Sequence, residues 1–145
     1  MRFYSLRMRA INNIVIHCTA TPQTASISNI RRYWRDVLGW KSPGYHRIVE
    51  ADGTMVVIAP DSAICNGVAG HNANILHISY ICGIDGLDRP KDTRTNAQRA
   101  TLERQVKEWK RLYPNARILG HKDFPGVKKA CPSFDVAAWL KEIGL

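Results

Sequence analysis

Short strand-like segments alternate with amphipathic helical segments along this chain, and that alternation constrains its fold more than any other feature. The run Ile-Val-Ile-His-Cys predicts a buried strand at 14–18, and further strands are predicted at 45–50, 54–59, 75–82 and 116–119. Helices are predicted at 26–38, from a Thr95–Gln98 capping box to Pro114, and at 136–143. This order predicts an α/β fold in which helices flank a mixed β-sheet.

The length of the chain and its turn signals support one compact unit. A chain of 145 residues leaves room for a single domain, 1–145, and not for two. Asp52-Gly53 predicts a hairpin turn, and Gly39 predicts the end of the first helix. No apolar run reaches the roughly 20 residues of a membrane span or the about 7–15 of a secretory signal. We therefore expect no membrane span, no signal peptide and synthesis in the cytoplasm.

The net charge of +9 predicts attraction to polyanions such as nucleic acid, anionic lipid or a bacterial cell wall. A basic protein without any such partner is the alternative, and charge alone does not choose among them. A nucleic-acid binder is expected to show a basic stripe interleaved with aromatic residues. The lysines and arginines are scattered instead, which argues against specific nucleic-acid binding.

None of the four cysteines belongs to a Cys-x-x-Cys pair, so a zinc ribbon or a thioredoxin-type site is excluded. Without a signal peptide we expect no disulfide, and Cys18, Cys65 and Cys82 are predicted to be small buried hydrophobic residues. Neighbouring residues of a strand face opposite ways, so a His17 that faces a site leaves Cys18 facing the core.

Two histidines and the remaining cysteine could form a metal site. His17 and His121 lie where predicted strands meet loops, and Cys131 follows in the same loop as His121. Such a set could hold Zn²⁺ and leave its fourth position open, as in catalytic zinc sites. The spacing alone also allows ordinary surface histidines. The neighbouring Lys128 and Lys129 would suit a thiolate ligand, a nucleophilic cysteine, or simply a solvated loop.

Six segments, in order, resemble the zinc-dependent N-acetylmuramoyl-L-alanine amidases, a family that includes small phage lysozymes and the peptidoglycan recognition proteins. The first is Val-Ile-His-Cys-Thr-Ala-Thr at 15–21. Gly-Trp at 39–40 with Gly-Tyr-His at 44–46 and Asp-Gly-Thr at 52–54 follow. Gly-His-Asn at 70–72 with Gly-Ile-Asp at 83–85, Gly-His-Lys-Asp at 120–123 and Lys-Ala-Cys-Pro-Ser-Phe-Asp at 129–135 complete the set. The resemblance spans about residues 13–141, which is nearly the whole chain.

The resemblance implies one Zn²⁺ per chain with His17, His121 and Cys131 as its ligands. It also implies Tyr45 as the catalytic tyrosine and Lys129 as the catalytic lysine. The implied fold is that of the amidases and peptidoglycan recognition proteins.

Other residues in or near the matched segments have no implied role in the site or differ from the family pattern. Lys128 lies outside the motif, and His46 should point away from the neighbouring tyrosine in a structural role. His77 stands where the family usually has a small residue, and Cys82 stands where a glycine is common. These departures affect expected substrate contacts and leave the implied chemistry unchanged.

The implied activity is hydrolysis of the amide between N-acetylmuramic acid and the L-alanine of the peptidoglycan stem peptide, by a monomer that acts on the cell wall after release. A binding module of the same fold is the alternative. The complete set of three implied ligands argues against it, because recognition-only relatives often lose the cysteine. The resemblance also leaves open a regulatory protein partner such as an RNA polymerase, for which no residue here gives support.

Overall fold

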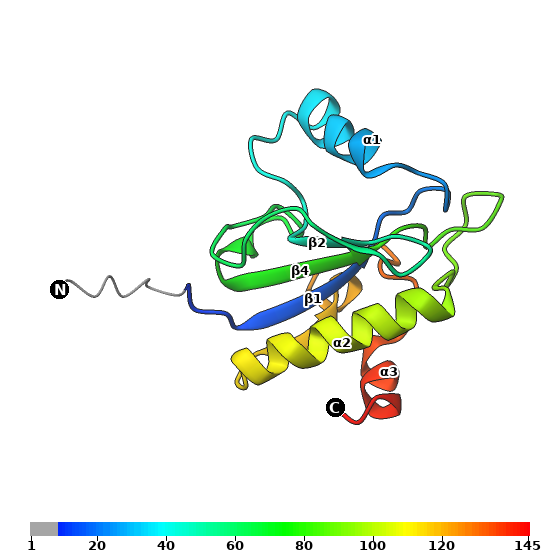
Figure 1. Cartoon of the computed structure of the whole chain (residues 1–145). Helices are drawn as coiled ribbons and strands as arrows, with labels where there is room; N and C mark the ends of the chain where they lie inside the picture. The colour runs from blue at the N-terminus through cyan, green and yellow to red at the C-terminus, as the bar shows by residue number, and fades with distance from the viewer. Residues whose placement is uncertain (1–8) are drawn as a thin grey trace.

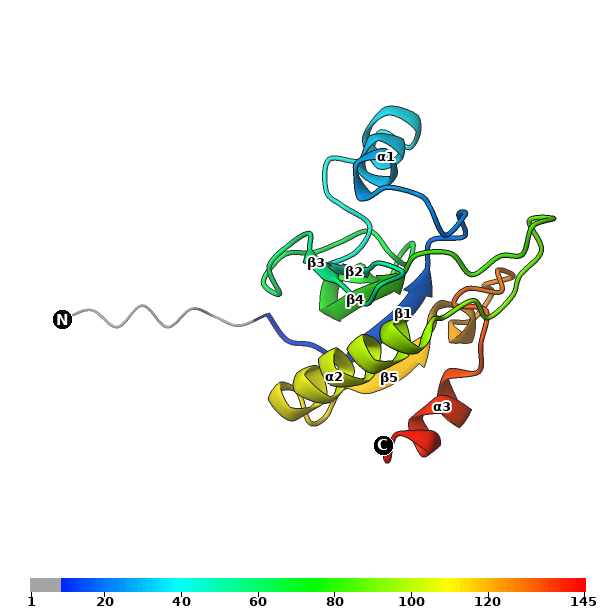
Figure 2. The ribbon, with the colours of Figure 1, turned by 45° about the vertical axis from the view of Figure 1, so that its right-hand side comes forward.

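The computed structural model describes residues 9–145 and contains one five-stranded sheet of strand order β3-β2-β4-β1-β5 (Figures 1 and 2). The strands are β1 (Asn13–Cys18), β2 (Arg47–Val49), β3 (Met55–Val57), β4 (Ile75–Tyr80) and β5 (Arg117–Gly120). β1 pairs in parallel with β4 and β5, β2 pairs in parallel with β4, and β3 is the antiparallel edge. The sheet is therefore mixed, as predicted.

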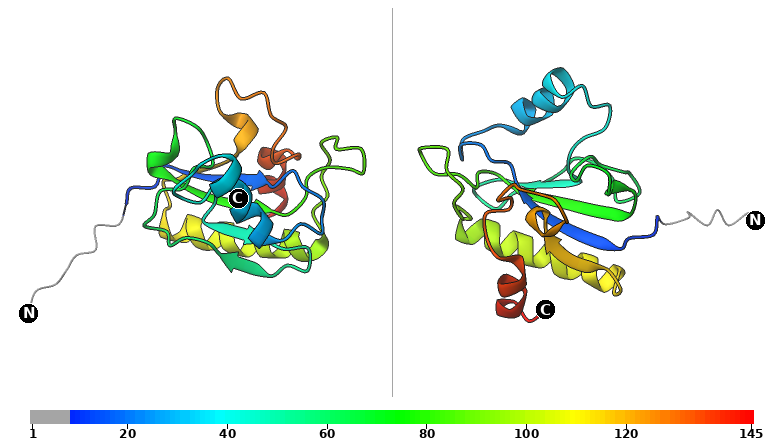
Figure 3. Two further views of the ribbon diagram at one scale, coloured as in Figure 1. Left: turned by 90° about the horizontal axis from the view of Figure 1, so that it is seen from above. Right: turned by 180° about the vertical axis from the view of Figure 1, so that it is seen from behind.

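Helices cover both faces of the sheet (Figures 1 and 3). α2 (Asn96–Leu112) and α3 (Val136–Glu142) lie on one face, and α1 (Ile27–Arg32) lies over the other. Short helical turns occur at η1 (Tyr33–Val37), η2 (Asn72–Asn74) and η3 (His121–Asp123). No helix among residues 9–145 is long and apolar enough to cross a membrane.

The alternation of side chains along β1 divides the core into two parts. Ile14, Ile16 and Cys18 belong to the cluster that packs against α2 and α3, where Trp109 is buried. Val15 and His17 face the opposite side, and Val15 packs in a smaller cluster there. The predicted two-residue alternation is confirmed, and it directs His17 to the sheet face that α1 only partly covers.

The first helix differs most from its prediction. Ser26 caps it, because its side chain accepts a hydrogen bond from the Asn29 backbone N–H, but regular α-helix ends at Arg32 and a π-helical turn follows. The wider turn rotates later residues away from their α-helical positions. Val37, at the end of this turn, is 67% exposed. Gly39 ends the segment as predicted, with φ of +67°.

The remaining boundaries shift by a few residues. The predicted strands 45–50 and 54–59 shrink to three residues each, with the Asp52-Gly53 turn between them as predicted. The segments 66–74 and 121–133, which lie outside the predicted helices and strands, each contain a 3₁₀ turn. Thr95 and Gln98 form the predicted capping box at the start of α2. Cys18, Cys65 and Cys82 are unpaired and buried, as predicted.

Candidate functional site

His17, His121 and Cys131 converge beyond the carboxyl end of β1. Their ligand atoms all lie within 4.8 Å of one another, and His17 Nδ1 is 3.8 Å from Cys131 Sγ. The rings of His17 and His121 meet edge to face with 5.0 Å between centroids. No other such group of metal-ligating side chains occurs among residues 9–145.

The sheet register brings the two histidines together. β1 and β5 are parallel neighbours in which Ile16 pairs with Gly120. His17 follows Ile16, and His121 follows Gly120 at the end of β5, so the two histidines lie side by side. Asp123 Oδ2 accepts a hydrogen bond of 2.8 Å from the Gly120 backbone N–H and so closes the η3 turn that carries His121. Asp123 therefore supports the site through the backbone of this turn.

The loop that carries Cys131 is tied to the ends of several strands. Cys131 Sγ accepts a hydrogen bond of 3.2 Å from the Cys18 backbone N–H. The Tyr80 hydroxyl donates to the Pro132 carbonyl at 2.6 Å, and the Ser133 hydroxyl donates to the Gly83 carbonyl at 3.0 Å. These contacts fix the position of the thiol relative to β1, although Cys131 is 113 residues away from Cys18 in the chain.

The three side chains fit a zinc ion. Around a tetrahedral zinc, with Zn–N of about 2.0 Å and Zn–S of about 2.3 Å, neighbouring ligand atoms lie about 3.3–3.6 Å apart. The separation of His17 Nδ1 from Cys131 Sγ is close to this range. Burial, together with the nearby His77, His121 and Lys129, lowers the pKa of His17 well below its ordinary value. Burial and Lys129 also lower the pKa of His121. Both rings are therefore neutral at pH 7 and able to bind a cation.

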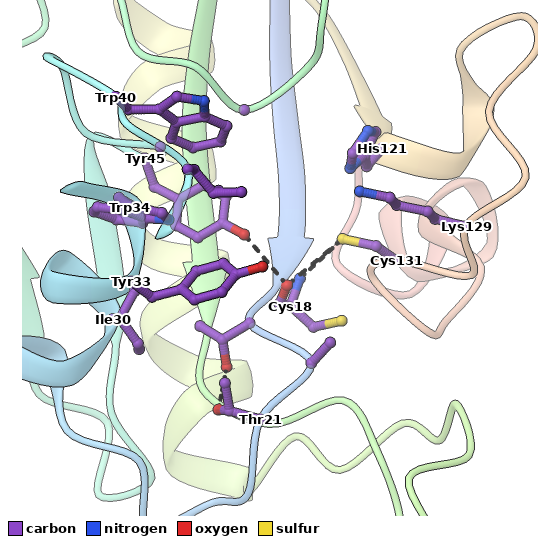
Figure 4. A pocket seen from close by; sticks show the side chains of 15 residues that line it. Cys18, Thr21, Ile30, Tyr33, Trp34, Trp40, Tyr45, His121, Lys129 and Cys131 are labelled. Atoms are coloured by element: carbon purple, nitrogen blue, oxygen red, sulfur yellow. Dashed lines mark hydrogen bonds between the residues drawn. The ribbon is translucent and has the colours of Figure 1, made fainter. Parts of the chain in front are cut away.

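A cavity of about 630 Å³ opens beside these side chains. Figure 4 shows its two walls on either side of the end of β1, with His121, Lys129 and Cys131 on one wall. The opposite wall is largely aromatic and aliphatic, and it comes from α1, η1 and the segment after them: Ile30, Tyr33, Trp34, Leu38, Trp40 and Tyr45. The arrangement suits a ligand with an apolar or sugar-like face and a polar group at the histidines.

Tyr45 forms part of the aromatic wall and lies against His17, one of the three candidate metal ligands. Its ring centroid is 4.8 Å from that of His17, and its hydroxyl lies 3.5 Å from the Cys18 carbonyl oxygen. Burial raises the pKa of Tyr45, and the neighbouring Cys131 and Cys18 add to the effect. The phenol therefore keeps its proton at neutral pH and can act as a hydrogen-bond donor.

The two adjacent lysines differ in their relation to the cavity. Lys129 lines it, with its ammonium directed toward His121 and Cys131 (Figure 4), whereas Lys128 is exposed and is not among the lining residues. The cavity lining contains no aspartate or glutamate among the described residues. Lys129 is therefore the charged side chain that faces a bound ligand at this end.

Two further histidines stand behind the cavity, and both are fully buried. His46 points away from Tyr45 as expected, because its Nε2 donates to the Ala63 carbonyl and its Nδ1 accepts from the His77 backbone N–H. His77 Nδ1 lies 2.8 Å from His17 Nε2. The sequence marked His77 as a departure, but its contact with His17 was missed. The contact depends on the parallel register of β1 and β4, in which Val15 is the partner of His77, and no local sequence pattern gave that register.

Cys82, the other departure, has an identifiable backbone role. Its φ is +110°, in the region that favours glycine, which accounts for the glycine expected at this position. Its backbone N–H donates to Thr19 Oγ1 at 2.9 Å, and its thiol donates to the Ile84 carbonyl at 3.3 Å. The first of these hydrogen bonds holds the residues just after β4 against the segment that follows β1, and the second stays within the turn after β4.

Comparisons with known proteins agree with this geometry. Residues 7–134 match the N-acetylmuramoyl-L-alanine amidase family. An endolysin of Enterobacteria phage K11 is 34% identical over 128 residues, which cover 87% of this chain and 83% of the phage protein. An endolysin of Escherichia phage T7 is 31% identical over 131 residues, covering 89% and 85%.

Solved structures show the same fold. The Ph2119 endolysin from the Thermus scotoductus MAT2119 bacteriophage Ph2119 has a TM-score of 0.76 and 25% identity, covering 94% of this chain and 86% of that one. The N-acetylmuramoyl-L-alanine amidase LysC from Clostridium intestinale URNW has a TM-score of 0.75 and 21% identity, covering 93% and 86%. The predicted fold class and family resemblance are confirmed.

Proposed function

Since the chain belongs to the N-acetylmuramoyl-L-alanine amidase family, we propose that it is a zinc-dependent enzyme that cleaves the amide between N-acetylmuramic acid and the stem-peptide L-alanine. The observation that carries this proposal is the convergence of His17, His121 and Cys131 on the wall of an open cavity. The relatives named endolysins support a substrate in the cell wall.

One zinc ion per chain would be held by two neutral imidazoles and the Cys131 thiolate. When bound, zinc supplies polarisation of the scissile carbonyl and a water molecule of lowered pKa. Two neutral ligands and one thiolate leave a formal charge of +1 at the site. The backbone N–H of Cys18 that donates to Cys131 Sγ stabilises negative charge on that sulfur.

Lys129 and Tyr45 are proposed to act on the charge that develops during attack on the amide. Attack on the carbonyl carbon converts its oxygen into an oxyanion. Lys129 offers a cation, and the protonated Tyr45 hydroxyl offers a hydrogen-bond donor, from opposite walls of the cavity. Fixed donors of this kind stabilise the transition state more than the ground state, and the loss of one costs about 10²–10³ in rate.

The proposed setting follows from charge and substrate. Stem peptides and wall polymers carry carboxylates and phosphates, so a chain of net charge +9 should accumulate on the wall, with a salt-dependent affinity. We propose that a single chain acts as a monomer on peptidoglycan after release from the cell that makes it. No nucleic-acid or protein partner is needed for this activity.

The test is release of new amino groups from purified peptidoglycan, measured with the metal content of the same sample. We expect one zinc per chain, loss of activity with a chelator and recovery when zinc is returned. Cys131→Ser should lose most of its zinc, because a neutral hydroxyl replaces a thiolate. Unchanged zinc content in this variant would contradict the ligand assignment. Peptidoglycan binding without amino-group release would instead indicate a binding module.

A further inference from the structure

We propose that His77 and Asn72 form a hydrogen-bonded relay that fixes the tautomer of His17, so that its Nδ1 rather than its Nε2 is presented to the metal. The inference rests on the proposed zinc site and adds a positioning role for two residues outside it. The relay runs from a backbone N–H through Asn72 and His77 to His17, and each step follows from donor and acceptor chemistry.

The outer end of the relay determines where the proton of His77 lies. Asn72 Oδ1 accepts a hydrogen bond of 2.8 Å from the Val68 backbone N–H, which identifies this side-chain atom as the amide oxygen. The same oxygen lies 3.0 Å from His77 Nε2. Because an amide oxygen only accepts hydrogen bonds, His77 Nε2 must carry a hydrogen.

The inner end then determines the tautomer of His17. His77 is fully buried, and the described residues offer it no carboxylate partner, so a second ring proton would place an unpaired charge in the interior. Its Nδ1 is therefore an acceptor. His17 Nε2, at 2.8 Å, must donate to it. The lone pair of His17 then lies on Nδ1, which is the ring nitrogen 3.8 Å from Cys131 Sγ.

The surrounding backbone holds the two rings in contact. The main chain of His77 exchanges two hydrogen bonds with His46: its N–H donates to His46 Nδ1, and its carbonyl accepts the His46 backbone N–H, each at 3.0 Å. Gly67 passes directly over the pair. A Cβ there would lie 2.4 Å from His77 Nδ1 and 2.9 Å from His17 Nε2, so only glycine leaves room for this hydrogen bond.

The relay should raise the affinity for zinc. A ligating imidazole whose other nitrogen donates to a fixed acceptor is held in one orientation and becomes more basic, and loss of such a partner typically weakens metal binding about 10–100-fold. His77 therefore supplies the partner of His17 from the neighbouring strand, at a position where the resemblance led us to expect a small residue.

The matched pair His77→Leu and His77→Asn tests the relay. The two replacements have nearly the same shape, but the amide oxygen of asparagine can occupy the position of imidazole Nδ1 and accept from His17, whereas leucine cannot. We expect His77→Leu to bind zinc about 10–100-fold more weakly in competition with a chelator. His77→Asn should recover most of that affinity. His71→Leu, which removes an exposed histidine of the adjacent segment, should bind zinc like the parent.

The tautomers can also be read directly in the zinc-free parent protein from two-bond ¹H–¹⁵N couplings of the histidine rings. We expect both His17 and His77 to carry their hydrogen on Nε2. A hydrogen on His17 Nδ1, or equal zinc affinity of the parent and a folded His77→Leu variant, would overturn the relay. Absence of zinc binding by the parent would instead overturn the proposed function, and the tautomer measurement would still decide the relay.

Discussion

Adjacent residues of one loop can differ completely in function, and Lys128 and Lys129 illustrate this. The two carry the same charge and are both exposed, yet only Lys129 lines the cavity. Its charge also contributes to the lowered pKa values of His17 and His121. A charge acts through its distance from the reacting atoms, so one position along the chain separates a proposed catalytic group from a solvated side chain.

The first prediction compares these lysines. Lys129→Ala should keep its zinc and its fold, but its rate of amino-group release should fall by a factor of about 10²–10³, because a cation next to the oxyanion is removed. Lys128→Ala removes the same charge from the same loop and should retain most activity at the same salt concentration. Equal and mild losses in both variants would show that Lys129 contributes only general attraction to the wall.

The second prediction concerns the hydroxyl of Tyr45. Tyr45→Phe keeps the ring against His17 and removes only the donor, so zinc content should be unchanged while kcat falls more than KM rises. Steady-state kinetics on a soluble muropeptide would separate the two constants. A variant whose KM rises while kcat stays constant would place Tyr45 in substrate binding rather than in transition-state stabilisation.

At the scale of elements, α2 supports the site from the opposite face of the sheet. Thr95 Oγ1 accepts the Gln98 backbone N–H at 3.0 Å and donates to the Ala51 carbonyl at 2.7 Å. The buried Gln98 side chain donates to the carbonyls of Val49 and Ile81 at the ends of β2 and β4. The capping box therefore joins the start of the helix to the carboxyl ends of the parallel strands, the same end of the sheet at which the candidate site lies.

The third prediction is that Thr95→Ala lowers the free energy of unfolding by about 1–2 kcal/mol. The substitution removes the helix-capping hydrogen bond from the Gln98 backbone N–H and the hydrogen bond to the Ala51 carbonyl. Thr95→Ser should keep most of the stability. Urea unfolding measures both variants. Zinc affinity should stay at the parental value, since the hydrogen bonds of Thr95 are with Gln98 and Ala51 and not with the three proposed ligands. A large loss of zinc would contradict this separation of the helix cap from the site.

At the scale of the whole molecule, buried histidines make stability depend on pH. Burial lowers the pKa of His46 from an ordinary 6.5 to about 4. The unfolded chain takes up this proton below pH 6.5, whereas the folded chain resists it until about pH 4. The stabilisation is therefore complete above pH 6.5 and is lost as the pH falls toward 4, by an amount on the order of 3 kcal/mol.

The fourth prediction follows from this loss of stability at low pH. Between pH 7 and 4.5, the unfolding free energy of the parent should fall more steeply than that of His46→Gln, which has no ring to protonate. Denaturant unfolding at several pH values gives both slopes. Parallel curves for the parent and His46→Gln would mean that burial of His46 carries no pH-dependent cost.

The sequence by itself determined the element order, the hairpin turn and the capping box, because these depend on neighbouring residues and on local backbone preferences. The two-residue alternation of β1, which is also a local property, assigned the side chains of His17 and Cys18 to opposite faces of the sheet. Together with the family resemblance, it also selected the three side chains that converge at the site. Local rules were insufficient at the first helix, where the π-helical turn of Tyr33–Val37 exposes Val37.

Only the tertiary structure decided how these residues meet. The parallel pairing of β1 with β4 and β5 places His17 beside His77 and His121, which are 60 and 104 positions further along the chain. The aromatic wall from α1 and η1 faces Lys129 across the cavity for a similar reason. Strand register and loop packing are set by burial over the whole sheet, so no local pattern encodes which nitrogen of His17 faces Cys131.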